Sequence, residues 1–237
     1  MRLRELAGVG PFFALREDRP DDPEGYLPLG PEVMRSRITT VAGRLGTTDR
    51  RVAASIAFQG VAGRLLSIGL GSAVLTGHVP DLAACGGLRW HPARTAPDDL
   101  WLPGTPVALP PAGDPAERAA RVSATVLHGL LVPLHDATRT ATGVSARLLW
   151  GNAGSSLAGS LRVLHSWCHE RGRQRDAEQA LEVTRALFED PLLRATGTLT
   201  STPAGIAFER TTCCLYYRLP TGGLCGDCVL RHPPRER

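Results

Sequence analysis

The longest apolar stretch of the chain covers residues 51–75, where nearly every position is small or aliphatic. A surface helix would carry polar residues along one side, and this segment has too few of them. It therefore predicts a helix that is buried on all sides. Gly60, Gly63, Gly69 and Gly71 lie within it and indicate either a break or very close packing against neighbouring helices.

Four further segments repeat apolar residues every three or four positions, as amphipathic helices do. They cover residues 31–46, 114–134, 145–172 and 176–189. Proline lacks a backbone N–H and clashes with the preceding helical turn, so Pro133 is expected to kink or divide its helix near His135. His128 and His135 are seven residues apart and share one face of a regular helix; we interpret both as core or rim residues.

Short alternating segments predict a small β component. Residues 86–91 and 99–102 are typical of two short strands that can pair, and residues 197–200 and 205–210 alternate like a hairpin. One more short strand is expected at Pro11–Leu15, in a lead-in rich in proline, glycine and aspartate.

The fold class predicted from these patterns is α+β, with a mainly α-helical body and a small antiparallel β element. We expect the body to cover residues 1–200 and a separate C-terminal module to cover residues 201–237.

Composition narrows the class of protein further. The 237 residues are 43% hydrophobic, which suits a globular chain with one substantial core. The formal charge is +4 and every basic residue is arginine, scattered among acidic residues rather than gathered in a stripe, which weighs against nucleic-acid binding. The first ten residues are too polar for a signal peptide, and the most apolar run, Leu65–Leu75, is shorter than the about 20 residues that span a bilayer. We therefore expect a cytoplasmic protein that is not an integral membrane protein.

Four of the six cysteines lie close together near the C-terminus, with the spacing C-C-x10-C-x2-C. They are Cys213, Cys214, Cys225 and Cys228. In a chain without an export signal, clustered cysteines bind metal more often than they form disulfides. The motif therefore predicts a four-thiolate site for a zinc ion or an iron–sulfur cluster.

The adjacent pair Cys213-Cys214 favours the cluster. Neighbouring side chains of an extended chain point to opposite faces, so two adjacent thiolates reach one small ion with difficulty. Zinc sites usually combine two loops with two to four residues inside each cysteine pair. A two-iron cluster is a larger target, although the pair still needs a local bend. A structural zinc site remains the alternative.

The segment Arg210-Thr-Thr-Cys213-Cys214-Leu-Tyr-Tyr-Arg218-Leu-Pro, followed by Gly-Gly-Leu-Cys225-Gly-Asp-Cys228, resembles the C-terminal signature of FhuF-type ferric-siderophore reductases. That family carries a [2Fe–2S] cluster on the same cysteine spacing. The resemblance implies that the four cysteines are the cluster ligands. It also implies an oxidoreductase acting on metal ions, which reduces an Fe(III)-siderophore by one electron and releases Fe(II) in the cytosol.

The alternative is an iron–sulfur electron-transfer or redox-sensing protein without its own siderophore substrate, because such a protein would share the module. No dinucleotide-binding glycine motif is present, so the partners expected are a ferric siderophore and an external electron donor such as a ferredoxin or flavoprotein reductase. We expect no catalytic side chain beyond the cluster.

Substrate contacts are expected in the body and beside the cysteines. Through the family likeness, Trp150 and Asn152 are candidate pocket residues. Arg210, Arg218 and Arg231 could stabilise the added negative charge of a reduced cluster or attract an anionic chelate, and of the three we favour Arg218.

The two other cysteines have simpler interpretations. His165, Cys168 and His169 lie on one helix in a spacing that could bind a metal, but a helix end with a buried cysteine has the same sequence, and we favour that interpretation. Cys85 is likewise interpreted as a packed thiol.

Overall fold

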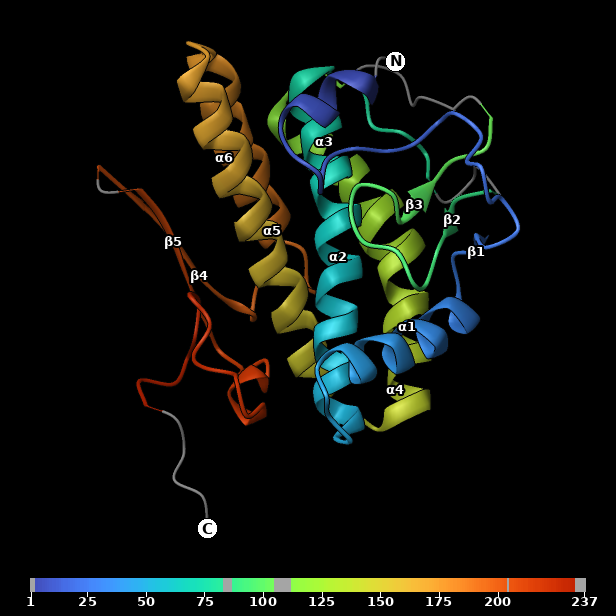
Figure 1. The fold of residues 1–237 in the computed structure, drawn as a ribbon. Helices are drawn as coiled ribbons and strands as arrows, with labels where there is room; N and C mark the ends of the chain where they lie inside the picture. Colours follow the sequence, from blue (N-terminus) through green and yellow to red (C-terminus); the bar gives the residue numbers. More distant parts are fainter. Residues whose placement is uncertain (1–2, 83–86, 105–111, 204, 233–237) are drawn as a thin grey trace.

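The central apolar segment forms one unbroken helix, α2 (Arg50–Leu75), in the middle of the fold (Figure 1). The computed structural model describes residues 3–82, 87–104, 112–203 and 205–232. The side chain of Asp49 caps α2 by accepting hydrogen bonds from the backbone N–H groups of Arg51 and Val52, at 2.9 and 3.3 Å. From Val52 to Val74 nearly every residue of α2 is buried, so the prediction of a central buried helix is confirmed.

The glycines of α2 serve close packing rather than a break. A Cβ at Gly63 would lie 3.1 Å from the ring of Phe12, and one at Gly71 would lie 2.7 Å from the ring of Phe13. Gly69 admits the side chain of Val126 in the same way. The second of the two predicted alternatives is therefore the one that the fold uses.

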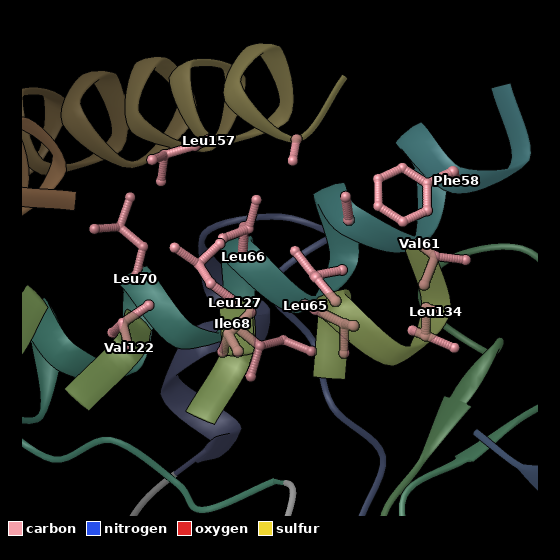
Figure 2. Close-up of a cluster of buried hydrophobic side chains, with 14 of the residues drawn as sticks. Phe58, Val61, Leu65, Leu66, Ile68, Leu70, Val122, Leu127, Leu134 and Leu157 are labelled. Atoms are coloured by element: carbon pink, nitrogen blue, oxygen red, sulfur yellow. The ribbon is translucent and has the colours of Figure 1, made fainter. Parts of the chain in front are cut away.

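Helices surround α2 on several sides, and α5 makes the most extensive contact with it. Figure 2 shows Leu65, Leu66 and Ile68 of α2 between Leu157 of α5 and Leu127 of the opposite helix. All five side chains are fully buried, and burial of a leucine or isoleucine side chain stabilises a fold by about 1.5–3 kcal/mol. The predicted helices are confirmed as α1 (Pro31–Arg44), α5 (Ala146–Glu170) and α6 (Gln174–Phe188).

The helix around Pro133 differs from the prediction. It runs without a break through α3 (Pro115–Val122), a π-helical segment η2 (Ser123–Leu131) and α4 (Val132–Thr142). The missing N–H of proline is accommodated by a wider turn ahead of it, in which Val132 N–H bonds to the Leu127 carbonyl. The helix is therefore not divided near His135, and the irregularity expected from Pro133 is a change of hydrogen-bond pattern directly ahead of it.

The altered helical register also separates the two histidines of this helix. His135 is buried, with its ring stacked on Trp150 at 4.9 Å between centroids. His128 is exposed and lies 3.1 Å from a carboxylate oxygen of Asp190.

A small antiparallel sheet lies beside the helices, and it includes the predicted strand pair. Its strands are β1 (Leu27–Pro28), β2 (Arg89–Trp90) and β3 (Leu100–Trp101), in the order β1-β2-β3. Arg89 pairs with Trp101, and Trp90 with Leu100. The first residue of the expected strand 86–91 lies outside the described residues.

The strand predicted at Pro11–Leu15 was wrong. The chain turns there after a short 3-10 helix, η1 (Leu3–Gly8), and only Arg16 bridges to the sheet, at Trp101. A side chain holds this segment in place of strand pairing: the buried guanidinium of Arg64 donates to the carbonyls of Pro11, Phe12 and Ala14, and its Nε lies 2.9 Å from Asp99 Oδ1.

The predicted hairpin is confirmed as β4 (Gly197–Thr202) and β5 (Gly205–Arg210), paired from Gly197 with Arg210 to Thr202 with Gly205. Figure 1 shows the hairpin and the cysteine segment, orange to red, next to α5. The fold is thus α+β, as predicted, with a helical majority and two small antiparallel sheets.

One helix of the described residues, α2, is long and apolar enough by length and composition to cross a membrane. Of its apolar window, 83% is buried inside the protein. This burial is typical of the core helix of a soluble protein.

Candidate iron–sulfur centre

The C-terminal strand β5 leads directly into the four clustered cysteines. Within the described part of the chain every cysteine is a free thiol, and Cys85 lies outside that part. Cys214 is buried, whereas Cys213, Cys225 and Cys228 are half-buried. The thiols therefore lie at the edge of the protein, partly open to solvent.

The bend expected at the adjacent cysteine pair lies immediately after it. Leu215 has φ 68° and ψ 3°, and it is the only non-glycine residue with positive φ among the described residues. A left-handed conformation costs an ordinary residue about 1–2 kcal/mol. The short 3-10 helix η3 (Tyr216–Arg218) follows and turns the chain back. The strained conformation of Leu215 is therefore the point at which the chain changes direction after Cys213 and Cys214.

The thiols influence one another strongly. A hydrogen bond from the Cys225 thiol, helped by the Tyr216 backbone and the charge of Arg210, lowers the pKa of Cys214 to about 7 against the opposing effect of burial. The same bond raises the pKa of Cys225, which holds the proton. Burial raises the pKa of Cys213, and the neighbouring Cys228 and Cys225 add to this shift. Each of the four sulfurs is therefore close enough to at least one other for an electrostatic interaction.

Each of the four sulfurs has a backbone hydrogen-bond partner two residues further along the chain. The pairs are Leu215 with Cys213 (N–Sγ 3.3 Å), Tyr216 with Cys214, Asp227 with Cys225, and Leu230 with Cys228 (N–Sγ 3.4 Å). Hydrogen bonds to cysteine sulfur stabilise the thiolate form and orient it, which a metal ligand requires. All four cysteines thus share the same local arrangement, in which a backbone N–H two residues further along donates to the sulfur.

Small residues on α5 make room for this segment. A Cβ at Gly151 would overlap Thr212 Oγ1, and a Cβ at Gly154 would overlap Thr196 Oγ1. Ser155, on the next position of α5, donates a 2.5 Å hydrogen bond to the carboxylate of Asp227, between the last two cysteines. The helical body and the cysteine loop are therefore packed closely together.

A chain of buried hydrogen bonds also connects the two. Arg210 Nη2 lies 2.5 Å from Asn152 Oδ1. The amide nitrogen of Asn152 donates to the carbonyl and hydroxyl oxygens of Ser55 on α2, at 2.8 and 2.9 Å. The hydroxyl of Ser55 in turn donates to the carbonyl of Cys214 at 2.6 Å. This network fixes one cysteine relative to both central helices.

The residues present fit a [2Fe–2S] cluster. Arg210 is 1% exposed, yet its Nε and Nη1 have no hydrogen-bond partner among the described residues. Its charge contributes to the lowered pKa of Cys214, and it opposes the rise that burial causes in the pKa of Cys213 and that the Cys214 hydrogen bond causes in the pKa of Cys225. Buried donors are almost always paired, so a buried cation with unused N–H groups beside four thiols suits an anionic group held between them.

Among the described residues, no three His, Cys, Asp or Glu side chains are arranged so that they could already hold one metal ion.

A cleft of about 650 Å³ opens between α2 and α5 and reaches the cysteine loop at Cys225 and Asp227. Phe12 and Val163 line it and are 44% and 48% exposed. Arg162, also in the lining, lies 3.0 Å from a carboxylate oxygen of Asp227. The cleft therefore has an apolar part and a paired charge next to the thiols.

The structure places the predicted substrate residues away from this cleft. Trp150 packs on His135, and Asn152 is fully buried between Ser55 and Arg210. Arg218 is exposed and pairs with Asp49 at 3.3 Å. None of the three predicted residues lines the cleft, and Arg210, not Arg218, is the arginine buried beside the thiols.

The cleft residues were missed because they come from distant parts of the sequence. A signal for the packing of α5 was present in the small residues Gly151, Gly154 and Ser155, which share one side of a long helix.

Cys168, on α5, is a buried thiol as predicted. It is fully buried, and burial raises the pKa of its thiol. The rings of His165 and His169 lie 4.4 Å apart.

Comparison with protein families identifies the cysteine segment. No curated protein matches the chain. Residues 210–230 match the family model described as the FhuF 2Fe-2S C-terminal domain. The matched segment begins at Arg210 and includes all four clustered cysteines. The chain therefore carries an FhuF-type C-terminal module, and the cofactor of that module is a [2Fe–2S] cluster.

Proposed function

We propose that this iron–sulfur protein is a cytoplasmic ferric-siderophore reductase. One observation carries the proposal: the cleft between α2 and α5 ends at Cys225 and Asp227, next to the thiols that would hold the cluster. Its volume of about 650 Å³ lies within the range of about 300–1,000 Å³ that is usual for small-molecule sites. A chelate in the cleft would be adjacent to the site of electron transfer.

The lining suits a chelate with an oxygen-rich centre and a carbon backbone. The side-chain amide of Gln59 can donate to hydroxamate or catecholate oxygens. The hydroxyls of Ser156 and Ser160 already donate to the carbonyls of Gln59 and Ser156, so they can accept from N–H or O–H groups of a ligand. Phe12 and Val163 offer apolar surface to the carbon chain. Hydroxyl groups and apolar surface would together orient the ligand without the need for a large net charge in the cleft.

Four residues would hold the cofactor: Cys213, Cys214, Cys225 and Cys228. When bound, a [2Fe–2S] cluster transfers one electron at a time. Reduction of Fe(III) to Fe(II) lowers the charge density of the ion, so hard oxygen donors bind it less strongly and the siderophore is released unchanged. The electron comes from an external donor, which we propose to be a ferredoxin or a flavoprotein reductase. The enzyme class is thus an oxidoreductase acting on metal ions.

The test is rapid mixing of the dithionite-reduced protein, freed of excess reductant, with ferric siderophores of the hydroxamate and catecholate classes. We expect the visible spectrum of the oxidised cluster to return at a rate that saturates with siderophore concentration. One Fe(II) per electron should be captured by a colorimetric Fe(II) chelator. The matched control is the Ga(III) complex of the same siderophore, which has nearly the same shape but accepts no electron. It should slow the reaction competitively.

A second candidate function, electron transfer or redox sensing without a siderophore substrate, is favoured by the surface next to the cysteines. Leu224 and Val229 flank Cys225 and Cys228 and are 36% and 37% exposed, which suits contact with a protein partner. A reduced protein that exchanges electrons with a ferredoxin, but ignores every ferric siderophore and is unaffected by the Ga(III) complexes, would replace the reductase proposal with this one.

A further inference from the structure

Arg210 is a buried charge that the described protein leaves incompletely paired. Its side chain is 1% exposed, and of its three nitrogens only Nη2 has a partner, Asn152 Oδ1. A buried polar group without a partner costs about 1–3 kcal/mol, and a charged group costs more. An arginine in this position therefore needs a further acceptor.

The acidic side chain nearest in sequence to the cysteine ligands is already engaged. The carboxylate of Asp227 accepts hydrogen bonds from Ser155 at 2.5 Å and from Arg162 at 3.0 Å. Arg210 contacts Asp227 only through the backbone, where its N–H donates to the Asp227 carbonyl at 3.1 Å. Glu209, the preceding residue of β5, is exposed. The missing acceptor for the guanidinium therefore does not come from a carboxylate of this loop.

The cysteine sulfurs are the candidate acceptors, although neither free nitrogen of Arg210 hydrogen-bonds to a thiol of the described residues. The positive charge of Arg210 acts electrostatically on Cys213, Cys214 and Cys225, so the guanidinium lies on the side of the segment that carries these three sulfurs. A [2Fe–2S] cluster with four thiolates is a dianion when oxidised and carries one more negative charge when reduced. It also presents sulfur atoms that accept hydrogen bonds.

We propose that the Nε–H and Nη1–H groups of Arg210 donate hydrogen bonds to the sulfur atoms of the [2Fe–2S] site, and that Asn152 is the positioning residue that aims the guanidinium there. The proposal rests on the cofactor and not on siderophore reduction, so it stands or falls separately from the proposed function.

The surroundings of Arg210 support a fixed orientation. Asn152 is itself held by two hydrogen bonds to Ser55, so its Oδ1 has a defined direction. A Cβ at Gly151 would come within 3.3 Å of Arg210 Nη2, so the glycine leaves room for the guanidinium against α5. A charge held rigidly in a site with little water acts more strongly than a mobile one. Arg210 would therefore stabilise the reduced state and raise the reduction potential.

The experiment compares three variants of the full-length, cluster-loaded protein by redox titration and resonance Raman spectroscopy. Arg210→Met removes the charge and the donors at similar length. Arg210→Lys keeps the charge but loses the planar fork of donors. Asn152→Ala removes the contact that orients Arg210. Arg147→Met is the control, because Arg147 is exposed at the start of α5 and its substitution changes the net charge by the same amount.

We expect Arg210→Met to lower the ratio of reduced to oxidised protein at least tenfold at a fixed ambient potential, which is a shift of about 59 mV for one electron. The Fe–S stretching bands should shift as well. Arg210→Lys should fall between Arg210→Met and the parent, Asn152→Ala should shift in the same direction by less, and Arg147→Met should match the parent. A folded Arg210→Met protein that no longer retains its cluster would also support the proposal.

Two results would overturn it. The first is an Arg210→Met protein that keeps the cluster with the parental potential and Raman bands. The second is loss of the helical circular-dichroism signal in both Arg210→Met and Arg210→Lys, because Arg210 would then act on folding and not on the cluster.

Discussion

Asn152, in the second turn of α5, and Arg210, the last residue of β5, face each other across a buried 2.5 Å hydrogen bond. This bond connects the helical body to the cysteine segment three residues before Cys213. The tripeptide Trp150-Gly151-Asn152, which the family likeness indicates as a pocket element, thus lies at the contact between α5 and the C-terminal segment. The helical body thus contacts the cysteine segment directly through buried hydrogen bonds.

Replacement of Gly151 by alanine should loosen this contact. Alanine favours a helix interior by about 1 kcal/mol over glycine, but a Cβ at Gly151 overlaps Thr212 Oγ1. We expect Gly151→Ala to lower the thermal midpoint and to reduce the iron retained per chain. Gly159→Ala on the same helix is the matched control: its Cβ would approach only the flexible end of Arg162, at 3.9 Å, so it should raise stability by up to about 1 kcal/mol. Equal stability of the two variants would contradict the close contact.

The cysteine assignment predicts a clear division among serine variants. Substitution of any one of the four clustered cysteines should abolish or strongly destabilise the visible cluster spectrum, because each thiolate would occupy one ligand position. Cys168→Ser should leave the spectrum intact, since Cys168 is fully buried within α5 and apart from the loop. Iron content and visible absorption of anaerobically purified proteins provide the measurement. Loss of the cluster in Cys168→Ser alone would show that the ligand set is different.

The sequence predicted those features that depend on local pattern. The buried α2, the amphipathic α5 and α6, the hairpin and the cysteine spacing all follow from periodicity or from a short motif. An irregularity at Pro133 was predicted but its form was not, because a proline disturbs the helix ahead of it without determining how the hydrogen bonds rearrange. The π-helical segment η2 packs against another helix, with Val126 placed against Gly69 of α2. Such a contact between distant segments cannot be read from the local sequence.

The site beyond the cysteines could not be predicted because it is assembled across long sequence separations. Phe12, Arg162 and Asp227 meet at one cleft only after α2 and α5 have packed. The choice between Arg210 and Arg218 likewise depends on burial, since both flank the cysteines in sequence. Arg210 ends a strand that lies against α5, whereas Arg218 lies on an exposed turn.

The buried ion pair between Arg64 and Asp99 should be important for stability. The two side chains are 1% and 3% exposed, and removal of one partner from such a pair usually costs about 3–5 kcal/mol because the other charge is left uncompensated. We expect Asp99→Asn to reduce the free energy of unfolding by about this amount in denaturant titrations. Asp98→Asn is the neighbouring control, since Asp98 is 62% exposed and lies 3.8 Å from Arg16, and its cost should stay below about 1 kcal/mol. If Asp99→Asn reduced the free energy of unfolding by no more than the control Asp98→Asn, below about 1 kcal/mol, the Arg64–Asp99 pair would contribute little to stability.

Asp190 should make stability depend on acid pH. Burial alone would raise its pKa, but hydrogen bonds from Ser123, the Leu192 N–H and His128 outweigh burial and lower the pKa below the ordinary value of an aspartate. The unfolded chain therefore takes up this proton first as the pH falls. The stabilising contribution is fully present above about pH 5 and is lost as the pH falls through the lowered pKa.

Asp190→Asn should accordingly be less stable at pH 7 by about 1–2 kcal/mol and should lose less stability than the parent between pH 5 and pH 3. Urea titrations at pH 7, 5 and 3 measure both effects. Parallel stability curves for the two proteins would show that Asp190 has an ordinary pKa in the folded state.

The cleft can be blocked without a change at the cysteines. Gly60 of α2 lines the cleft, and a Cβ there would meet nothing within 4 Å, so Gly60→Leu should fill part of the space while leaving the helix intact or slightly more stable. We expect its reduced cluster to react with ferric siderophore at least tenfold more slowly, with an unchanged absorption spectrum and unchanged reduction by the electron donor. Gly43→Leu is the matched control, because Gly43 is an exposed helical glycine of α1 with equally open surroundings. If Gly60→Leu oxidised at the parental rate at every siderophore concentration, the chelate would have to approach the cysteines from another side, and the cleft would lose its place in the proposed function.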